Sequence, residues 1–293
     1  MTRSSGRKTS GNKSYKKSLP GCVKALLITF VLLCLASAAT FWFLFYTETG
    51  KKFGKDHIPY YTAAFRMYFT HPTMPQGTNG YGIDVSHYLG RIDWDKVAQI
   101  PYHKDTRIQE KDATTASVSI GFAFVKATEG ADITDDYAKR NIEGAREAGI
   151  PVGAYHVMTM ADAGKQAENF FANSYLEKGD LAPVIDLEDP YFKGVKKDDV
   201  RKQIKSLASL FEKKYGTKPI IYCSHNYSNV IDVEKHFPNY PLWIARYVTT
   251  TKPEMADIWQ FADNGRIPGI RIPVDLSAFY CKSYRLSDLT IKK

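Results

Sequence analysis

The sequence predicts an α/β fold, a truncated (β/α) barrel of eight strands and about five helices that follows one transmembrane helix. Short apolar runs alternate with helical patterns from about residue 81 onward, which is typical of parallel βα units. The last three apolar runs follow one another with little room for helices between them. A composition of 44% hydrophobic and 24% charged residues excludes a disordered, collagenous or coiled-coil chain.

Residues 25–46 form a run of 22 residues without a charge. A helix of this length, at about 1.5 Å per residue, crosses the roughly 30 Å hydrocarbon core of a bilayer. The preceding residues 1–24 hold seven basic and no acidic side chains. By the positive-inside rule we expect this tail in the cytoplasm, a single pass through the cell (inner) membrane, and a periplasmic or otherwise extracytoplasmic remainder.

A cleaved signal peptide is the alternative, because Ala36-Ser37-Ala38 has the pattern of a cleavage site. However, the apolar run continues through FWFLFY at 41–46, an aromatic cluster that suits the far membrane interface. We therefore expect an uncleaved anchor at 25–46 rather than cleavage after Ala38. Turn-forming residues in 47–80 predict a connector, and the barrel domain is expected to span 81–293.

The formal net charge of +9 and the pI near 9.1 would by themselves suggest a nucleic-acid partner. Seven basic residues belong to the tail, and the connector holds four basic against two acidic residues. The remaining domain has no net charge. The basic pI therefore reflects membrane orientation, and we expect no nucleic-acid partner.

The eight predicted strands share short apolar runs, several of them apolar on both faces as buried parallel strands are. They lie at 81–86, 121–127, 152–157, 182–188, 219–224, 241–247, 257–261 and 273–277. Residues 135–149 predict a helix that ends at Gly149 before Pro151. Residues 197–215 predict another, with apolar residues at helical spacing and Gly216 as its C-cap.

Polar side chains recur where these strands end. Because the catalytic groups of such barrels come from the C-terminal ends of the strands, these side chains are the candidate site residues. In chain order they are Asp84, Lys126, Glu129, His156, Asp186, Glu188, Tyr222, Trp243, Arg246, Gln260 and Asp275.

Asp186 and Glu188 are the strongest of these candidates, because residues two apart on a strand point to the same face. Asp84 and Asp275 come from the first and last strands, which become neighbours when a barrel closes. Four carboxyl groups at one mouth raise one another's pKa, so that one keeps its proton and can act as a general acid. Glycoside hydrolysis uses this arrangement.

Structural explanations compete with several of these assignments. Asp84 and Asp275 fit helix caps or ion pairs, and His156 alone fits a hydrogen-bonded core histidine. Aromatic side chains at Tyr222 and Trp243 fit either the core or a surface that stacks on sugar rings. Cys223 and Cys281 lie beyond the membrane helix, where a disulfide is allowed, but the sequence does not show whether they meet.

Together these motifs resemble glycoside hydrolase family 25, the Chalaropsis-type lysozymes or N-acetylmuramidases. The resemblance runs from about residue 81 to 280 and includes GIDVSHY with IDW, FVKATEG, GAYH, the 182–188 block, PIIYCS, PLWIARY, IWQF and PVDLSAF, all in the family's order.

The resemblance implies a modified TIM-like (β/α)5β3 barrel that hydrolyses the β-1,4 bond between N-acetylmuramic acid and N-acetylglucosamine in peptidoglycan. It implies that Glu188 is the general acid and that Asp186 assists by orienting the 2-acetamido group or stabilising an oxazolinium-like intermediate. Asp84 and Asp275 would complete the acidic cleft, and neither a metal nor an organic cofactor is implied. The expected substrate-binding residues are Tyr155, His156, Tyr222, Trp243, Arg246, Gln260, Lys126 and Glu129.

The sequence departs from the family pattern at three places. Residues 101–119 form a longer link than usual, on the face opposite the expected site. Val157 follows His156 where the family commonly has Phe, and Ser277 stands where it has Asn. We expect these two positions at the cleft rim, where they would affect fine specificity.

A non-catalytic peptidoglycan-binding scaffold on the same barrel is the alternative function. The retained carboxylates argue against it, because binding alone needs no protonated acid. The sequence indicates no particular protein partner.

Overall fold

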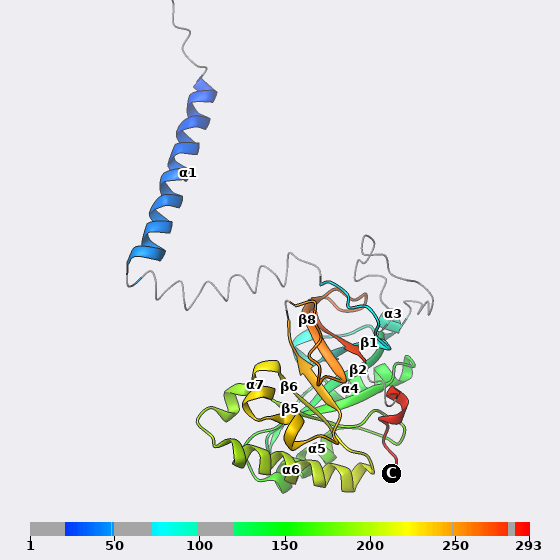
Figure 1. Ribbon diagram of the computed structural model, residues 1–293. Coiled ribbons are helices and arrows are strands. Elements are labelled where there is room, and N and C mark those ends of the chain that lie inside the picture. The colour runs from blue at the N-terminus through cyan, green and yellow to red at the C-terminus, as the bar shows by residue number, and fades with distance from the viewer. Residues whose placement is uncertain (1–20, 48, 50–71, 99–119, 248, 281–284) are drawn as a thin grey trace, which may run out of the picture. The chain divides into compact units, whose positions relative to one another are not determined.

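The computed structural model describes residues 21–47, 49, 72–98, 120–247, 249–280 and 285–293. Contacts between Cα atoms divide the chain into two compact units, Met1–Ala64 and Phe65–Lys293. The second unit carries the sheet, and its architecture is shown in Figure 1.

Within the described residues of the second unit, nine strands form one sheet. They are β1 (Gly80–Val85), β2 (Ile120–Glu129), β3 (Ile133–Thr134), β4 (Val152–Val157), β5 (Val184–Leu187), β6 (Ile220–Ser224), β7 (Leu242–Ala245), β8 (Ile258–Gly265) and β9 (Val274–Phe279). Their order is β1-β9-β8-β7-β6-β5-β4-β2-β3, and β1 also pairs with β2. This last pairing closes eight strands into a barrel, with the two-residue β3 as an antiparallel addition to β2.

The barrel is parallel from β1 through β2 and β4 to β8, whereas β9 runs antiparallel to both of its neighbours. In the described part of the chain, no helix lies between β7 and β8 or between β8 and β9. Antiparallel strands need only a short connection, which explains why β8 can be followed directly by β9.

Helices cover the outer face of the barrel (Figure 1). They are α3 (Trp94–Ala98), α4 (Ala138–Glu147), α5 (Ala163–Asn173), α6 (Lys197–Tyr215), α7 (His225–Val230) and α8 (Val233–His236), with 3₁₀ turns η1 (His87–Leu89), η3 (Asp189–Phe192) and η4 (Leu286–Asp288). The side chain of Asp162 caps α5 by accepting a hydrogen bond from the Lys165 N–H. Gly216, at a φ of 68°, ends α6 in the left-handed conformation that favours glycine.

The apolar residues form two buried clusters. The larger cluster lies between the strands and the helices and includes the stacked rings of Phe170 on α5 and Phe211 on α6, with centroids 4.6 Å apart. The smaller cluster contains Phe124 of β2 and Trp243 of β7. These two rings are 4.9 Å apart although their strands are not neighbours, so this cluster fills the inside of the barrel.

A glycine makes room for one of the interior rings. A Cβ atom on Gly153 of β4 would lie 2.7 Å from the ring of Phe124, closer than real Cβ contacts allow. The sequence therefore places glycine where an aromatic ring crosses a neighbouring strand. The interior below the mouth is a packed core, as in other (β/α) barrels.

The predicted (β/α)5β3 barrel is confirmed, and each of the eight predicted strands is present. The helix expected over 197–215 has those same bounds, whereas the helix expected over 135–149 begins later, at Ala138. The physical reason is Asp135, whose carboxylate accepts hydrogen bonds from the N–H groups of His87 and Tyr137 and so holds the chain in a turn. The longer link at 101–119 lies outside the described residues.

The first unit contains α1 (Gly21–Tyr46). Its segment Ala25–Phe43 is the one stretch among the described helices that is long and apolar enough to cross a membrane, although a signal sequence would meet the same criteria. The expected boundaries at 24, 46 and 80 stay predictions.

Candidate active site

A cavity of about 190 Å³ opens at the mouth of the barrel. Its lining is carboxylic and aromatic: Asp84, Tyr155, Asp186, Glu188, Tyr222, Trp243, Tyr247, Gln260 and Asp275. The structure thus brings together all four carboxyl groups that the sequence singles out, and with them four of the eight expected substrate-binding side chains.

Two of the carboxyl groups sit opposite each other on neighbouring strands. Asp84 of β1 pairs with Asp275 of β9 in the antiparallel register. Asp275 is the second residue of its strand, so it lies at the strand's N-terminal end. It reaches the mouth only because β9 runs opposite to the other barrel strands, and the C-terminal-end rule alone would not have placed it there.

The other two carboxyl groups belong to β5 and its end. Asp186 is within β5 and only 6% exposed, and its Oδ1 atom has no hydrogen-bond partner among the residues that the structure describes. Glu188 follows the last strand residue, Leu187, and is exposed at the mouth. A deep carboxyl group and a more accessible one therefore stand on the same side of the cavity.

The four carboxyl groups raise one another's pKa. Burial raises the pKa of Asp84 from 3.8 to about 7, with a contribution from the charge of Glu188. Burial raises the pKa of Asp186 well above its usual value, and the charges of Glu188 and Asp84 add to the shift. Partial burial raises the pKa of Glu188, as does the neighbouring Asp189. The pKa of Asp275 is raised well above its usual value by burial and by Asp84. The site therefore keeps protons at a pH where ordinary carboxyl groups have lost them.

Gln260 connects two tyrosines to Asp84. The hydroxyl groups of Tyr222 and Tyr247 donate to its Oε1 at 2.7 and 2.6 Å. This fixes the orientation of the amide, whose Nε2 donates to Asp84 Oδ1 at 2.8 Å. Asp84 is thereby held as a hydrogen-bond acceptor, and the bond from Gln260 opposes the effect of burial on its pKa.

Replacing Gln260 by leucine is expected to raise the pKa of Asp84 above about 7, because burial remains while the hydrogen bond that lowers the pKa is lost. Carboxyl ¹³C NMR titration of the protein measures this. The Gln203→Leu variant serves as control, because the Gln203 amide donates to the Ala161 carbonyl on another part of the barrel. An unchanged or lower Asp84 titration midpoint would contradict the role given to Gln260.

Trp243 forms part of the cavity wall and is nearly buried, at 2% exposed. Its indole Nε1 donates to Ser277 Oγ at 3.0 Å, and its ring lies edge-on to Tyr222 with centroids 4.7 Å apart. The hydrogen bond and the aromatic contact hold the ring in one orientation. Trp243 therefore offers a rigid apolar surface beside the carboxyl groups.

His156 does not reach the cavity. It is fully buried on the opposite face of β4 from Tyr155, with its Nδ1 2.7 Å from Thr128 Oγ1 and its Nε2 3.1 Å from Gln166 Oε1. Burial lowers its pKa to about 4. This placement corrects the expectation that His156 contacts substrate: alternate residues of a strand point to opposite faces, and Tyr155 is the one that faces the mouth.

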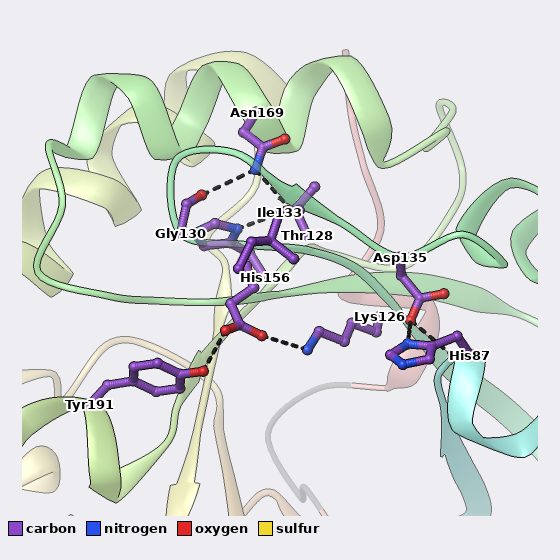
Figure 2. Close-up of polar contacts among 10 residues, drawn as sticks. His87, Lys126, Thr128, Gly130, Ile133, Asp135, His156, Asn169 and Tyr191 are labelled. Atoms are coloured by element: carbon purple, nitrogen blue, oxygen red, sulfur yellow. Dashed lines mark hydrogen bonds and ion pairs between the residues drawn. The ribbon is translucent and has the colours of Figure 1, made fainter.

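Lys126 and Glu129 lie beside the cavity without lining it. Lys126 Nζ is 2.7 Å from Glu129 Oε2, and the Tyr191 hydroxyl also donates to Glu129. Figure 2 labels Lys126 and Tyr191, and the dashed lines from both lead to this carboxylate. An irregularity in β2 between Lys126 and Thr128 shifts the strand register, which lets two residues three apart meet on one side. Arg246, the residue after the end of β7, is not part of the lining either.

A scan against family models matches residues 83–270 to glycosyl hydrolases family 25. The chain belongs to this family. The match covers the barrel from β1 to the loop before β9, including Asp84, Asp186 and Glu188.

Similar family 25 structures include a glycosyl hydrolase from Bacillus anthracis, which is 27% identical with a TM-score of 0.63 over 76% of this chain and 99% of that one. A bacterial lysozyme from Streptomyces coelicolor is also 27% identical, with a TM-score of 0.61 over 72% and 96% of the two chains. These likenesses support the closed barrel of mixed strands.

Similar sequences include the uncharacterized protein YegX of Escherichia coli K12, 33% identical over 211 residues that cover 70% of this chain and 71% of YegX. Lysozyme M1 of Streptomyces globisporus is 26% identical over 72% of each chain. The autolytic lysozyme of Clostridium acetobutylicum is 30% identical over 68% of this chain and 55% of its own.

The two departures from the family 25 pattern lie deeper than expected. Val157 is 4% exposed and Ser277 is fully buried, where its hydroxyl accepts the hydrogen bond from Trp243. Neither residue is at the cleft rim, which corrects that expectation. Ser277 acts on the site through the ring that it orients.

Tyr247 is the lining residue that the sequence analysis missed. It stands four residues after Trp243, so the alternation of a strand places both on the same face, and this spacing was the available signal. β7 ends at Ala245, but the alternation of side chains continues past this end, so Tyr247 still faces the cavity.

The possible disulfide falls on Cys281, which lies outside the described residues. Its proposed partner Cys223 is fully buried, and burial raises the pKa of its thiol.

Among the residues that the structure describes, no group of three or more His, Cys, Asp or Glu side chains is arranged to hold a metal ion. A larger groove of about 920 Å³ lies on α3 and α4 and shares no lining residue with the mouth.

Proposed function

We propose that this family 25 protein is a membrane-anchored muramidase that hydrolyses the β-1,4 bond between N-acetylmuramic acid and N-acetylglucosamine in peptidoglycan. The supporting observation is the group of four carboxyl groups with raised pKa values in one cavity beside tyrosine and tryptophan rings. A protein that only binds a glycan gains nothing from burying several acids together, which costs stability.

Glu188 is the general acid in this proposal. It is the most accessible of the four groups, and its raised pKa keeps a proton available for the leaving glycosidic oxygen. Asp186, two residues earlier within β5, assists by orienting the 2-acetamido group or stabilising an oxazolinium-like intermediate. Asp84 and Asp275 complete the acidic wall, and the rings of Tyr155, Tyr222 and Trp243 bind the sugar faces.

Digestion of purified peptidoglycan sacculi by the full chain in detergent tests this proposal. We expect loss of turbidity together with the release of new reducing ends. Saturable binding to sacculi with no reducing ends released would instead favour a non-catalytic scaffold on the same barrel.

We also propose that α1 is an uncleaved anchor, with the basic tail in the cytoplasm and the barrel beyond the membrane. The charge asymmetry around the apolar run and the aromatic cluster at 41–46 support this.

Mass spectrometry of the protein recovered from carbonate-washed membranes is expected to find peptides that span residues 25–46 intact. The reason is that FWFLFY extends the apolar run past the candidate cleavage site. A soluble protein whose N-terminus is Ala39 would show that the segment is a cleaved signal peptide instead.

A further inference from the structure

The proposed acid, Glu188, lies just beyond the end of β5. β5 ends at Leu187, and Glu188 is the residue before η3, in an extended conformation with φ −86° and ψ 117°. Its carbonyl oxygen accepts a hydrogen bond from the Tyr191 N–H at 3.1 Å. Since no strand ladder holds Glu188, the contacts of η3 decide where its side chain lies.

One side of η3 is fixed to β6 and α7. Ser224 Oγ donates to Asp189 Oδ1 at 3.1 Å, and the ring of Phe192 stacks on Tyr227 with centroids 5.5 Å apart and planes 14° from parallel. Phe192 is only 4% exposed. Because these contacts belong to the folded core, breaking them would destabilise the fold and also displace Glu188.

On its other side, η3 is hydrogen-bonded to β2 through the side chain of Tyr191. The Tyr191 hydroxyl donates to Glu129 Oε1, whose other oxygen accepts from Lys126 Nζ at 2.7 Å (Figure 2). The side chains of Lys126 and Glu129 are each only 15% exposed, so their ion pair is shielded from solvent. Tyr191 itself is 44% exposed, and its ring contributes little to the core.

The Lys126–Glu129 pair also acts on the acids electrostatically. Lys126 lowers the pKa of both Asp186 and Glu188, and Glu129 raises both. Burial raises the pKa of Glu129, but its hydrogen bonds from Lys126 and Tyr191 outweigh this and keep it ionised. The charged and titratable groups around Glu188 are Asp84, Lys126, Glu129, Asp186, Asp189, Tyr191 and Asp275.

We propose that Tyr191 is a positioning residue for the acid: its hydrogen bond to Glu129 fixes the η3 segment that carries Glu188 against the Lys126–Glu129 ion pair on β2. The inference rests on the proposed function, because it assigns Tyr191 to the same site. It also changes the role of Lys126 and Glu129 from the expected substrate contacts to a support for Glu188.

The test compares Tyr191→Phe with Tyr175→Phe, which removes a hydroxyl from a similarly exposed tyrosine in the loop between α5 and β5. For Tyr191→Phe we expect kcat on sacculi to fall about tenfold with KM within about twofold, since the acid is displaced while the binding surfaces remain. Tyr175→Phe should behave as the unaltered protein. A kcat for Tyr191→Phe equal to that of Tyr175→Phe would overturn the proposal.

A double-mutant cycle separates positioning from a general structural effect. Tyr191→Phe and Glu129→Gln break the same connection, so the double variant should lose no more kcat than the more impaired single variant. Fully additive losses would mean that the two side chains act independently and would also overturn the proposal. Equal unfolding midpoints in urea for the single variants and the unaltered chain exclude misfolding.

A titration that needs no activity keeps this inference separate from the proposed function. Glu129→Gln removes a negative charge near Glu188, so the pKa of Glu188 should fall, whereas Lys126→Met should raise it. Carboxyl ¹³C NMR, with the Glu188 signal assigned by its loss in Glu188→Gln, measures both shifts. If the unaltered chain releases no reducing ends, the muramidase proposal fails. Opposite shifts of the Glu188 pKa in the two variants would still support the inference that the Lys126–Glu129 ion pair acts on Glu188. Unmoved midpoints would overturn it.

Discussion

Replacing Glu188 by glutamine is expected to lower kcat on peptidoglycan by about 10²–10⁴-fold, the range that a positioned general acid contributes. Glutamine has nearly the same shape and retains polar contacts, but it has no proton to give to the leaving oxygen. Because Glu188 is exposed at the mouth, the fold should be undisturbed. Release of reducing ends from sacculi at saturating substrate measures the effect.

The matched control is Glu168→Gln, which makes the same chemical change on the exposed face of α5. It should retain full activity. The assignment of the acid would be wrong if Glu188→Gln and Glu168→Gln released reducing ends at equal rates.

Replacing Asp186 by asparagine is expected to lower activity about 10²-fold and, at the same time, to stabilise the protein at neutral pH. Burial, with the charges of Glu188 and Asp84, raises the pKa of Asp186 in the folded state above its unfolded value of 3.8. As the pH rises above about 4, the unfolded chain releases this proton before the folded chain does, so folding becomes less favourable. Asparagine removes that penalty.

The expected gain for Asp186→Asn is about 0.5–2 kcal/mol in the free energy of unfolding at pH 7, and no gain at pH 3, where the carboxyl group is protonated in both states. Urea unfolding at the two pH values measures it. Asp180→Asn is the contrasting control, since Asp180 is also buried but accepts hydrogen bonds from Arg146 at 2.6 and 3.1 Å. It should lose stability and keep activity. A loss of stability in Asp186→Asn at pH 7 would contradict the account of the buried carboxyl group.

The barrel and most of the residues at its mouth could be predicted because local sequence patterns indicate them. Each parallel strand has its own apolar run, and Asp186 with Glu188 shows the two-residue spacing of one strand face. Closure then brings Asp84 beside Asp275 as expected. These features depend on strand periodicity and on the order of the strands, both of which a sequence displays.

What could not be predicted depends on details of register and direction. Nothing local in the sequence shows that β9 runs antiparallel, although this direction decides that Asp275 reaches the mouth. The irregularity in β2 that brings Lys126 to Glu129 is likewise invisible without the neighbouring strand. The chemistry of His156 suggests a site residue, but the alternation of β4 points its ring toward the helices, where it contacts Phe170 and Phe211.

Contacts between segments that are far apart in the sequence could not be predicted either. The C-terminal residues pair with the chain just before β5, through a bridge between Leu181 and Thr290 and a hydrogen bond from the Ala182 N–H to the Leu289 carbonyl. Neither segment carries a pattern that identifies the other. Tyr191 was missed for the same reason, because its partner Glu129 lies 62 residues earlier in the chain.

Mass spectrometry of the products released from sacculi tests most directly whether this barrel is a muramidase. Borohydride reduction labels each new reducing end, so the sugar on the reduced side of every cut can be identified. The four-carboxyl site with Glu188 as acid predicts N-acetylmuramic acid at the new reducing ends, and none above background for Glu188→Gln. New ends that carry N-acetylglucosamine, or equal products from the two proteins, would contradict it.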